Sequence, residues 1–167
     1  MNDTFICSVC GKTHAGLPTD EAYGLPDEVW AIPQEERASR AKFDSNLCQF
    51  GDRHFIRCLL PVPFTEIDGY FGWGVWVEVD ETVFRRYLDL FDADGSSEPR
   101  HTGRLANALP VYPGMLGAKV SIQFGTSKDR PSVHLPAEDS SRLATEQRQG
   151  IDSTRHHEIL DALAACR

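Results

Sequence analysis

Two stretches in the middle of the chain carry the clearest strand pattern. Residues 54–62 are apolar on both alternating faces, which predicts a central strand covered on both sides. In residues 72–79, a tryptophan and three valines share one face, while Trp76 and Glu78 share the other. The second stretch therefore predicts a strand with one face toward the core.

A further strand is expected later in the chain. Residues 118–124 alternate apolar and polar side chains, as in a half-exposed antiparallel strand. A loop over residues 125–131 would return the chain to residues 132–135, which predicts a hairpin. Residues 105–114 contain two prolines that disfavour a central strand, so we expect a packed connection there.

Helical spacing occurs in three places after the central strands. Asp80 is a suitable N-cap for a helix whose apolar residues recur every three or four positions. Two more helical patterns, over residues 140–149 and 154–166, are separated by Gly150. This arrangement predicts an α+β fold, a mostly antiparallel sheet with helices on one face. The apolar residues of the first helix are Val83, Phe84, Tyr87, Leu88 and Phe91.

The first third of the chain, residues 1–52, has no such period. Short helical pieces are expected over Asp27–Ile32 and Gln34–Arg40, between turns marked by glycine and proline. A segment without apolar periodicity buries too little surface to offset its backbone entropy, so another interaction must hold it. We predict a single domain over residues 1–167, in which this irregular segment packs on an α+β core over residues 53–167.

Length and charge limit the expected partners and location. With 167 residues and 41% hydrophobic side chains, the chain has the size and composition of one globular domain. Its net charge of -8 repels phosphate backbones, so nucleic acid is not an expected partner. No apolar run approaches the roughly 20 residues of a membrane span and no signal-peptide pattern opens the chain, so we expect a cytoplasmic protein without membrane contact. The sequence does not determine the oligomeric state.

Cysteine spacing points to the most specific chemistry. Cys7 and Cys10, followed by a glycine, form a knuckle in which both sulfurs can face one cation. Cys48 lies in a polar stretch that offers a thiol no packing role, so it is the preferred third ligand. His14 is the preferred fourth ligand, and His54 is the alternative. The predicted site is a structural Zn2+ held by Cys7, Cys10, His14 and Cys48.

Other interpretations of the cysteines compete with zinc. Cys7 and Cys10 could be two buried apolar residues, or a redox pair, although no βαβ pattern follows them. Five cysteines in a reducing compartment favour metal binding or plain burial over disulfides. A thiol enzyme using Cys58 and His54 is disfavoured, because four residues along one strand span roughly 13 Å.

A second candidate surface lies on the central strands. Arg57 stands among apolar neighbours, where a guanidinium must reach solvent or meet a carboxylate of the protein or of a ligand. Trp76 is either a partner-binding aromatic or a residue packed under a helix. Arg57 and Trp76 define a possible ligand surface, and a hydrolase-type enzyme with its site there is the alternative function.

Several short motifs occur in a characteristic order through nearly the whole chain. They are Phe5-x-Cys7-x-x-Cys10-Gly11-x-x-His14-x-x-Leu17-Pro18, Leu47-Cys48, Phe55-Ile56-Arg57, Trp73-Gly74-Val75-Trp76-Val77, Leu109-Pro110-x-Tyr112-Pro113, Arg130-Pro131 and Glu146-Gln147-x-x-Gly150-Ile151. In this order they resemble the bacterial domain-of-unknown-function family 2199. The resemblance implies a small prokaryotic protein without an established activity, and its three cysteines imply a shared structural metal. The chain departs from the family pattern at Asn46, where the family tends to carry Asp, and at Ser141-Arg142, where it tends to carry His-Pro.

Together these features predict a zinc-stapled α+β protein that binds another protein or a small ligand without catalysing a reaction. A site of three cysteines and one histidine is closed, whereas a catalytic zinc keeps an open position. The sequence does not identify the partner.

Overall fold

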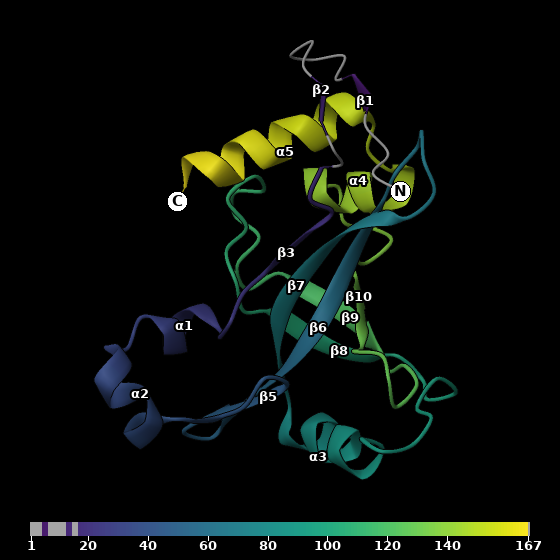
Figure 1. The fold of residues 1–167 in the computed structure, drawn as a ribbon. Coiled ribbons are helices and arrows are strands. Elements are labelled where there is room, and N and C mark those ends of the chain that lie inside the picture. Colours follow the sequence, from purple (N-terminus) through teal and green to yellow (C-terminus); the bar gives the residue numbers. More distant parts are fainter. Residues whose placement is uncertain (1–4, 7–12, 15–16, 167) are drawn as a thin grey trace.

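A barrel of five strands forms the centre of the protein. The computed structural model describes residues 5–6, 13–14 and 17–166 of the chain (Figure 1). The barrel strands are β6 (Arg53–Pro63), β7 (Tyr70–Val79), β8 (His101–Leu105), β9 (Lys119–Gln123) and β10 (Ser132–His134). Each strand is antiparallel to the next one along the chain. With an odd number of alternating strands the first and last point the same way, so the closing pair of β10 with β6 is parallel.

Shorter strands extend the barrel at its edges. β5 (Leu47–Phe50) pairs with the first residues of β6, and β4 (Lys42–Phe43) pairs in turn with β5. β3 (Asp20–Ala22) runs parallel to the first half of β7. A separate two-stranded sheet joins β1 (Phe5–Ile6) to β2 (Thr13–His14).

The helices lie at both ends of the barrel. α1 (Asp27–Trp30), α2 (Gln34–Arg40) and α3 (Glu81–Asp89) lie toward the end that carries β5 (Figure 1). α4 (Arg142–Gln149) and α5 (Ser153–Ala165) lie at the opposite end. No helix in residues 17–166 combines the length and apolar character that crossing a membrane requires. The predicted α+β class is confirmed, but the expectation of helices on one face of a sheet is wrong, because the sheet closes into a barrel.

The alternation of side chains along the hairpin of β6 and β7 separates two cores. The two strands pair over ten residues, from His54 opposite Val79 to Pro63 opposite Tyr70. Side chains on one face point into the barrel and belong to its core, as the alternation predicted. Full burial of each large apolar side chain stabilises the fold by about 1.5–3 kcal/mol. The barrel core includes Ile56, Cys58, Leu60, Val62, Trp73, Val75, Val77, Ile122 and Val133.

A second core lies on the outer face of the same hairpin. Trp76 and Phe55 are fully buried there beneath the N-terminal segment and its two short helices. The remaining members of this core come from that segment and are Leu25, Val29, Ile32, Ala41 and Cys48. The first third is therefore held, as expected, by an interaction outside itself, which is its packing on Phe55 and Trp76 of β6 and β7. Its apolar residues have no period along the chain, yet they converge on one tryptophan in space.

β8 was not predicted from the sequence. Only five residues form it, and one inward position is a glycine, so its apolar alternation is weak. A Cβ at Gly103 would lie 2.5 Å from Val77 Cγ1 and 2.7 Å from the Glu78 carbonyl oxygen. Glycine is required there because the β7 backbone comes this close.

Asn107 fastens the N-terminal segment to β7. Its Oδ1 accepts a hydrogen bond of 2.7 Å from the Trp76 backbone N–H. Its Nδ2 donates to the Leu25 carbonyl at 3.0 Å and to Asp27 Oδ1 at 2.9 Å. Asn107 is completely buried, and its bonds to Trp76 and Leu25 are shielded from water, while its bond to Asp27 is partly buried.

We expect Asn107→Asp to lower the free energy of unfolding by about 3 kcal/mol, because a buried donor becomes an acceptor that faces the Leu25 carbonyl and the Asp27 carboxylate. The same amide-to-carboxylate change at exposed Gln49, Gln49→Glu, should change it by less than about 0.5 kcal/mol. Urea unfolding of both variants measures the difference. Equal effects of the two substitutions would contradict this role of Asn107.

Candidate functional site

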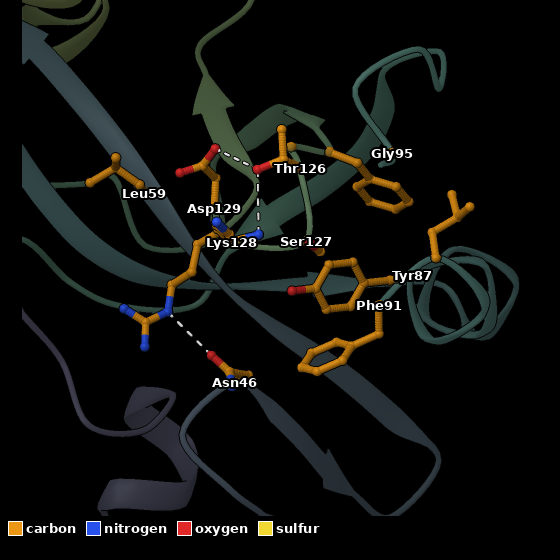
Figure 2. Close-up of a pocket in the computed structure, with 13 residues that line it drawn as sticks. Asn46, Leu59, Tyr87, Phe91, Gly95, Thr126, Ser127, Lys128 and Asp129 are labelled. Atoms are coloured by element: carbon orange, nitrogen blue, oxygen red, sulfur yellow. Dashed lines mark hydrogen bonds between the residues drawn. The ribbon is translucent and has the colours of Figure 1, made fainter. Parts of the chain in front are cut away.

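A cleft of about 490 Å³ lies between α3 and the loop that joins β9 to β10. Figure 2 shows Tyr87 of α3 and Phe91, which follows the end of α3, on one side, with Thr126, Ser127 and Lys128 on the other. Asn46, from the turn before β5, lies at a third side. The cleft therefore joins an apolar helix face to a polar loop. Its other lining residues are Leu59, Leu90, Gly95, Phe124, Gly125, Asp129 and Arg130.

Aromatic rings form the apolar wall. The Tyr87 ring lies 5.8 Å from the Phe91 ring, one helical turn further along the chain, and 5.3 Å from the Phe124 ring. Both pairs have the edge-to-face geometry that aromatic rings prefer. The helical stripe predicted from the sequence is wider than the face that packs on the core, and Phe91 remains 39% exposed.

Local hydrogen bonds shape the opposite loop. The Thr126 hydroxyl donates to Asp129 Oδ2 at 2.8 Å, and the Asp129 N–H donates to the Thr126 carbonyl at 3.1 Å. These bonds close a compact turn with exposed side chains at Lys128 and Arg130. Lys128, Asp129 and Arg130 all line the cleft, so the turn presents two cations and one hydrogen-bonded carboxylate to it.

Two arginines flank Asn46 at the end of the cleft. Arg130 Nε donates to Asn46 Oδ1 at 3.3 Å, the dashed line at Asn46 in Figure 2. Arg57 Nη1 donates to the neighbouring Ser45 carbonyl at 3.4 Å. Within residues 17–166, neither guanidinium has a carboxylate at ion-pair distance. Arg57 Nε is buried and has no hydrogen-bond partner there.

The ionisation states at this site follow from burial and like charge. Partial burial, with a smaller effect of nearby Arg130, lowers the pKa of Arg57 from its ordinary value. Burial raises the pKa of Tyr87 to about 12, so its phenol is neutral at physiological pH. Burial likewise raises the pKa of Cys58 in the barrel core, which keeps that thiol protonated. The site is thus cationic, and neither the phenol nor the thiol supplies a base.

Arg57, which the sequence indicated as a candidate, borders this cleft beside Ser45 without lining it, and the lining residues themselves were not predicted. The missed residues include Tyr87, Lys128 and Arg130, which lie far from Arg57 along the chain. One available signal was the polar loop over 125–131, which carries two cations in a chain of net charge -8. What brings this loop to Arg57 is the closing strand pair, in which Ser132 lies opposite Leu59.

The other member of the predicted ligand surface, Trp76, lies outside the cleft. Its side chain is fully buried in the second core, and its indole Nε1 donates to the Tyr23 carbonyl at 2.9 Å. Trp76 pairs with Arg57 across β6 and β7, so the two side chains share a face of the sheet. Of the two alternatives considered for Trp76, the structure supports packing beneath helical segments.

The predicted zinc set is only partly within the described residues. Cys7 and Cys10 lie outside them, and His14 belongs to β2. Among the described residues, no group of three or more His, Cys, Asp or Glu residues could hold a metal ion. The alternative ligand His54 is buried, and its ring lies 4.8 Å from the Phe84 ring. Zinc binding by the N-terminal cysteines stays a prediction.

The reason for choosing Cys48 as a zinc ligand is wrong. Cys48 lies in β5 rather than in a polar loop, and its side chain is buried in the second core. Burial, followed by the nearby Asp44 carboxylate, raises the pKa of this thiol to about 11. The structure thus gives Cys48 the packing role that its sequence surroundings did not indicate.

Cys48 also lies far from β2. Cys48 pairs with Phe55, which lies opposite Glu78 of β7, whereas Thr19 bonds to Gly72 at the other end of β7. Six strand residues separate these points by about 20 Å. β2 lies beside α5, at the opposite end of the barrel from β5 (Figure 1). The described backbone therefore does not bring His14 and Cys48 together.

Comparison with known proteins identifies the family. The chain matches the family model described as "Uncharacterized protein conserved in bacteria (DUF2199)" over residues 6–151. The chain therefore belongs to this family, as its motifs indicated. No curated protein and no solved structure matches the chain.

We expect Cys48→Ala to lower the free energy of unfolding by about 1–2 kcal/mol, because it leaves a small cavity in the second core. The same substitution at exposed Cys166 should have little effect. Elemental analysis of both variants, purified without added metal, should give the zinc content of the unaltered protein. Loss of zinc from Cys48→Ala alone would instead support Cys48 as a ligand.

Proposed function

We propose that this member of a bacterial family of uncharacterized proteins is a non-catalytic binding protein for small molecules. Its binding site is the cleft between α3 and the loop of residues 125–130. A ligand with an apolar, preferably aromatic, body fits this site. The observation that carries the proposal is the partly exposed aromatic wall of Tyr87 and Phe91 facing a polar loop across a cleft of about 490 Å³.

The construction of the cleft supports a binding role. Small-molecule sites are concave and mostly apolar, with a few polar groups that orient the ligand, and this cleft has the volume range of such sites. Tyr87 packs on the barrel core, so the wall is held by a rigid element. Phe91, one turn further, is free to contact a ligand.

The polar groups of the cleft support binding rather than acid–base chemistry. Its lining contains no histidine, cysteine or glutamate, and its carboxylate, that of Asp129, accepts a hydrogen bond from Thr126. The phenol of Tyr87 stays protonated because burial raises its pKa to about 12. A general base would need a pKa closer to neutrality.

Zinc would serve a separate role in this proposal. A metal at the N-terminal knuckle would stabilise the chain near β1 and β2, whereas the cleft lies beside α3. Zinc binding at the knuckle and ligand binding in the cleft are therefore independent proposals. Removing metal with a chelator would leave binding in the cleft unchanged.

We expect Phe91→Ala to weaken the binding of 2-naphthol, a neutral aromatic probe, by about fivefold, because part of the aromatic wall is lost. Leu88→Ala is the matched control, since Leu88 is a similarly exposed apolar residue of α3 outside the cleft lining. Isothermal titration calorimetry measures both dissociation constants. Unmeasurable binding to the unaltered protein, or equal binding by both variants, would argue against the cleft as the site.

A further inference from the structure

We propose that the cleft selects ligands whose aromatic or apolar body carries a doubly charged oxyanion, such as a phosphate monoester. Arg57, Arg130 and Lys128 would hold the oxyanion beside Asn46, while the body lies against Tyr87 and Phe91. This inference rests on the proposed function, because it names the ligand class of the same cleft.

The first support is the uncompensated positive charge of the arginine pair. Arg57 and Arg130 are close enough for Arg130 to lower the pKa of Arg57, and carbonyl or amide oxygens are their hydrogen-bond acceptors in residues 17–166. Two like charges beside one another repel. An anion between them would remove that repulsion and gain charge-assisted hydrogen bonds.

The second support is that the nearby carboxylates are already engaged. Asp44 Oδ1 accepts from the backbone N–H groups of Asn46 and Leu47, at 2.7 Å and 2.8 Å. Asp129 accepts from the Thr126 hydroxyl at 2.8 Å. Both acids hold turns in shape, and among the described residues neither lies at ion-pair distance from Arg57 or Arg130.

The third support is the contrast with arginines elsewhere in the chain. Arg53 contacts both Glu28 and Glu78, Arg86 contacts Glu98, and Arg155 contacts Glu146. With 25 acidic and 17 basic side chains in all, carboxylates are in excess. Arg57 and Arg130, like Arg37, Arg104 and Arg148, instead have carbonyl or amide oxygens as acceptors, and they lie beside one another next to the cleft.

The geometry leaves donors available at the head of the cleft. Arg130 uses Nε for Asn46, so its terminal nitrogens are free to bind two oxygens of one oxyanion. Arg57 Nε is buried, so Arg57 would reach the oxyanion through its terminal nitrogens, of which Nη1 donates to the Ser45 carbonyl. Lys128 lines the cleft from the loop and is exposed (Figure 2). Three cations at one site favour a dianion over the single charge of a carboxylate.

The test compares three probes with one ring system, 2-naphthyl phosphate, 2-naphthoate and 2-naphthol, by calorimetry at constant ionic strength. We expect 2-naphthyl phosphate to bind about tenfold more tightly than 2-naphthol, with 2-naphthoate between them. Arg130→Gln should weaken 2-naphthyl phosphate by about tenfold and change 2-naphthol by less than about twofold.

Two further variants keep the result interpretable. Lys128→Gln changes an exposed loop side chain without disturbing the core, and should weaken 2-naphthyl phosphate by about threefold. Arg40→Gln removes the same charge as Arg130→Gln from an exposed position on α2, and should leave every affinity unchanged. A loss of affinity in Arg40→Gln equal to that in Arg130→Gln would overturn the assignment, since it would show a general charge effect.

The outcomes separate this inference from the proposed function. Equal affinities for 2-naphthyl phosphate and 2-naphthol would overturn the oxyanion site while leaving the aromatic cleft intact. Equal affinities for the phosphate and 2-naphthoate would overturn the preference for a dianion. Failure of all three probes to bind would overturn the proposed function together with the inference.

Discussion

The ten-residue pairing of β6 with β7 is the interaction on which the rest of the structure depends. Both faces of this hairpin are buried, one by the barrel and the other by the N-terminal segment. Because side chains alternate across a strand, the same residues that close the barrel core also present Phe55 and Trp76 to the second core. A slip of one residue in the register would exchange the two faces and destroy both cores.

Closure of the barrel determines where the candidate site lies. β10 pairs in parallel with the middle of β6, and the Leu59 N–H donates to the Pro131 carbonyl at 2.8 Å. This contact draws the preceding loop, with Lys128 and Arg130, to the edge of β6 that carries Arg57. β5 pairs with the same edge nearer the start of β6 and supplies the turn that contains Asn46. The cleft thus forms where two segments share one edge of a long strand, and α3 closes its remaining side.

The charges beside this cleft are part of its character. Some other arginines pair with carboxylates, such as Arg155 with the buried Glu146, and others, such as Arg37 and Arg148, bond to backbone carbonyls. Beside the cleft, Arg57 is partly buried near another cation, and both effects lower its pKa. Under the oxyanion proposal, a bound anion would offset this repulsion.

The sequence alone determined the elements with a strong period. The strands at β6, β7 and β9, the hairpin to β10, the helices after Asp80 and near the C-terminus, and the family were all evident from it. These features could be predicted because each depends on residues close together along the chain. The short helices of the first third were also indicated by local proline and turn signals.

The tertiary structure alone decided what depends on distant residues. Only closure of the barrel shows that β8 is a strand, because Gly103 is there to admit the backbone of β7 rather than to fill the core. Only packing shows that Cys48 is a core residue, because its apolar neighbours Phe55 and Trp76 follow it by 7 and 28 positions in the sequence. Arg57 and Arg130 meet because β10 closes on β6, a pairing between residues 73 positions apart. A local sequence pattern does not indicate such contacts, so the candidate cleft could be identified only from the tertiary structure.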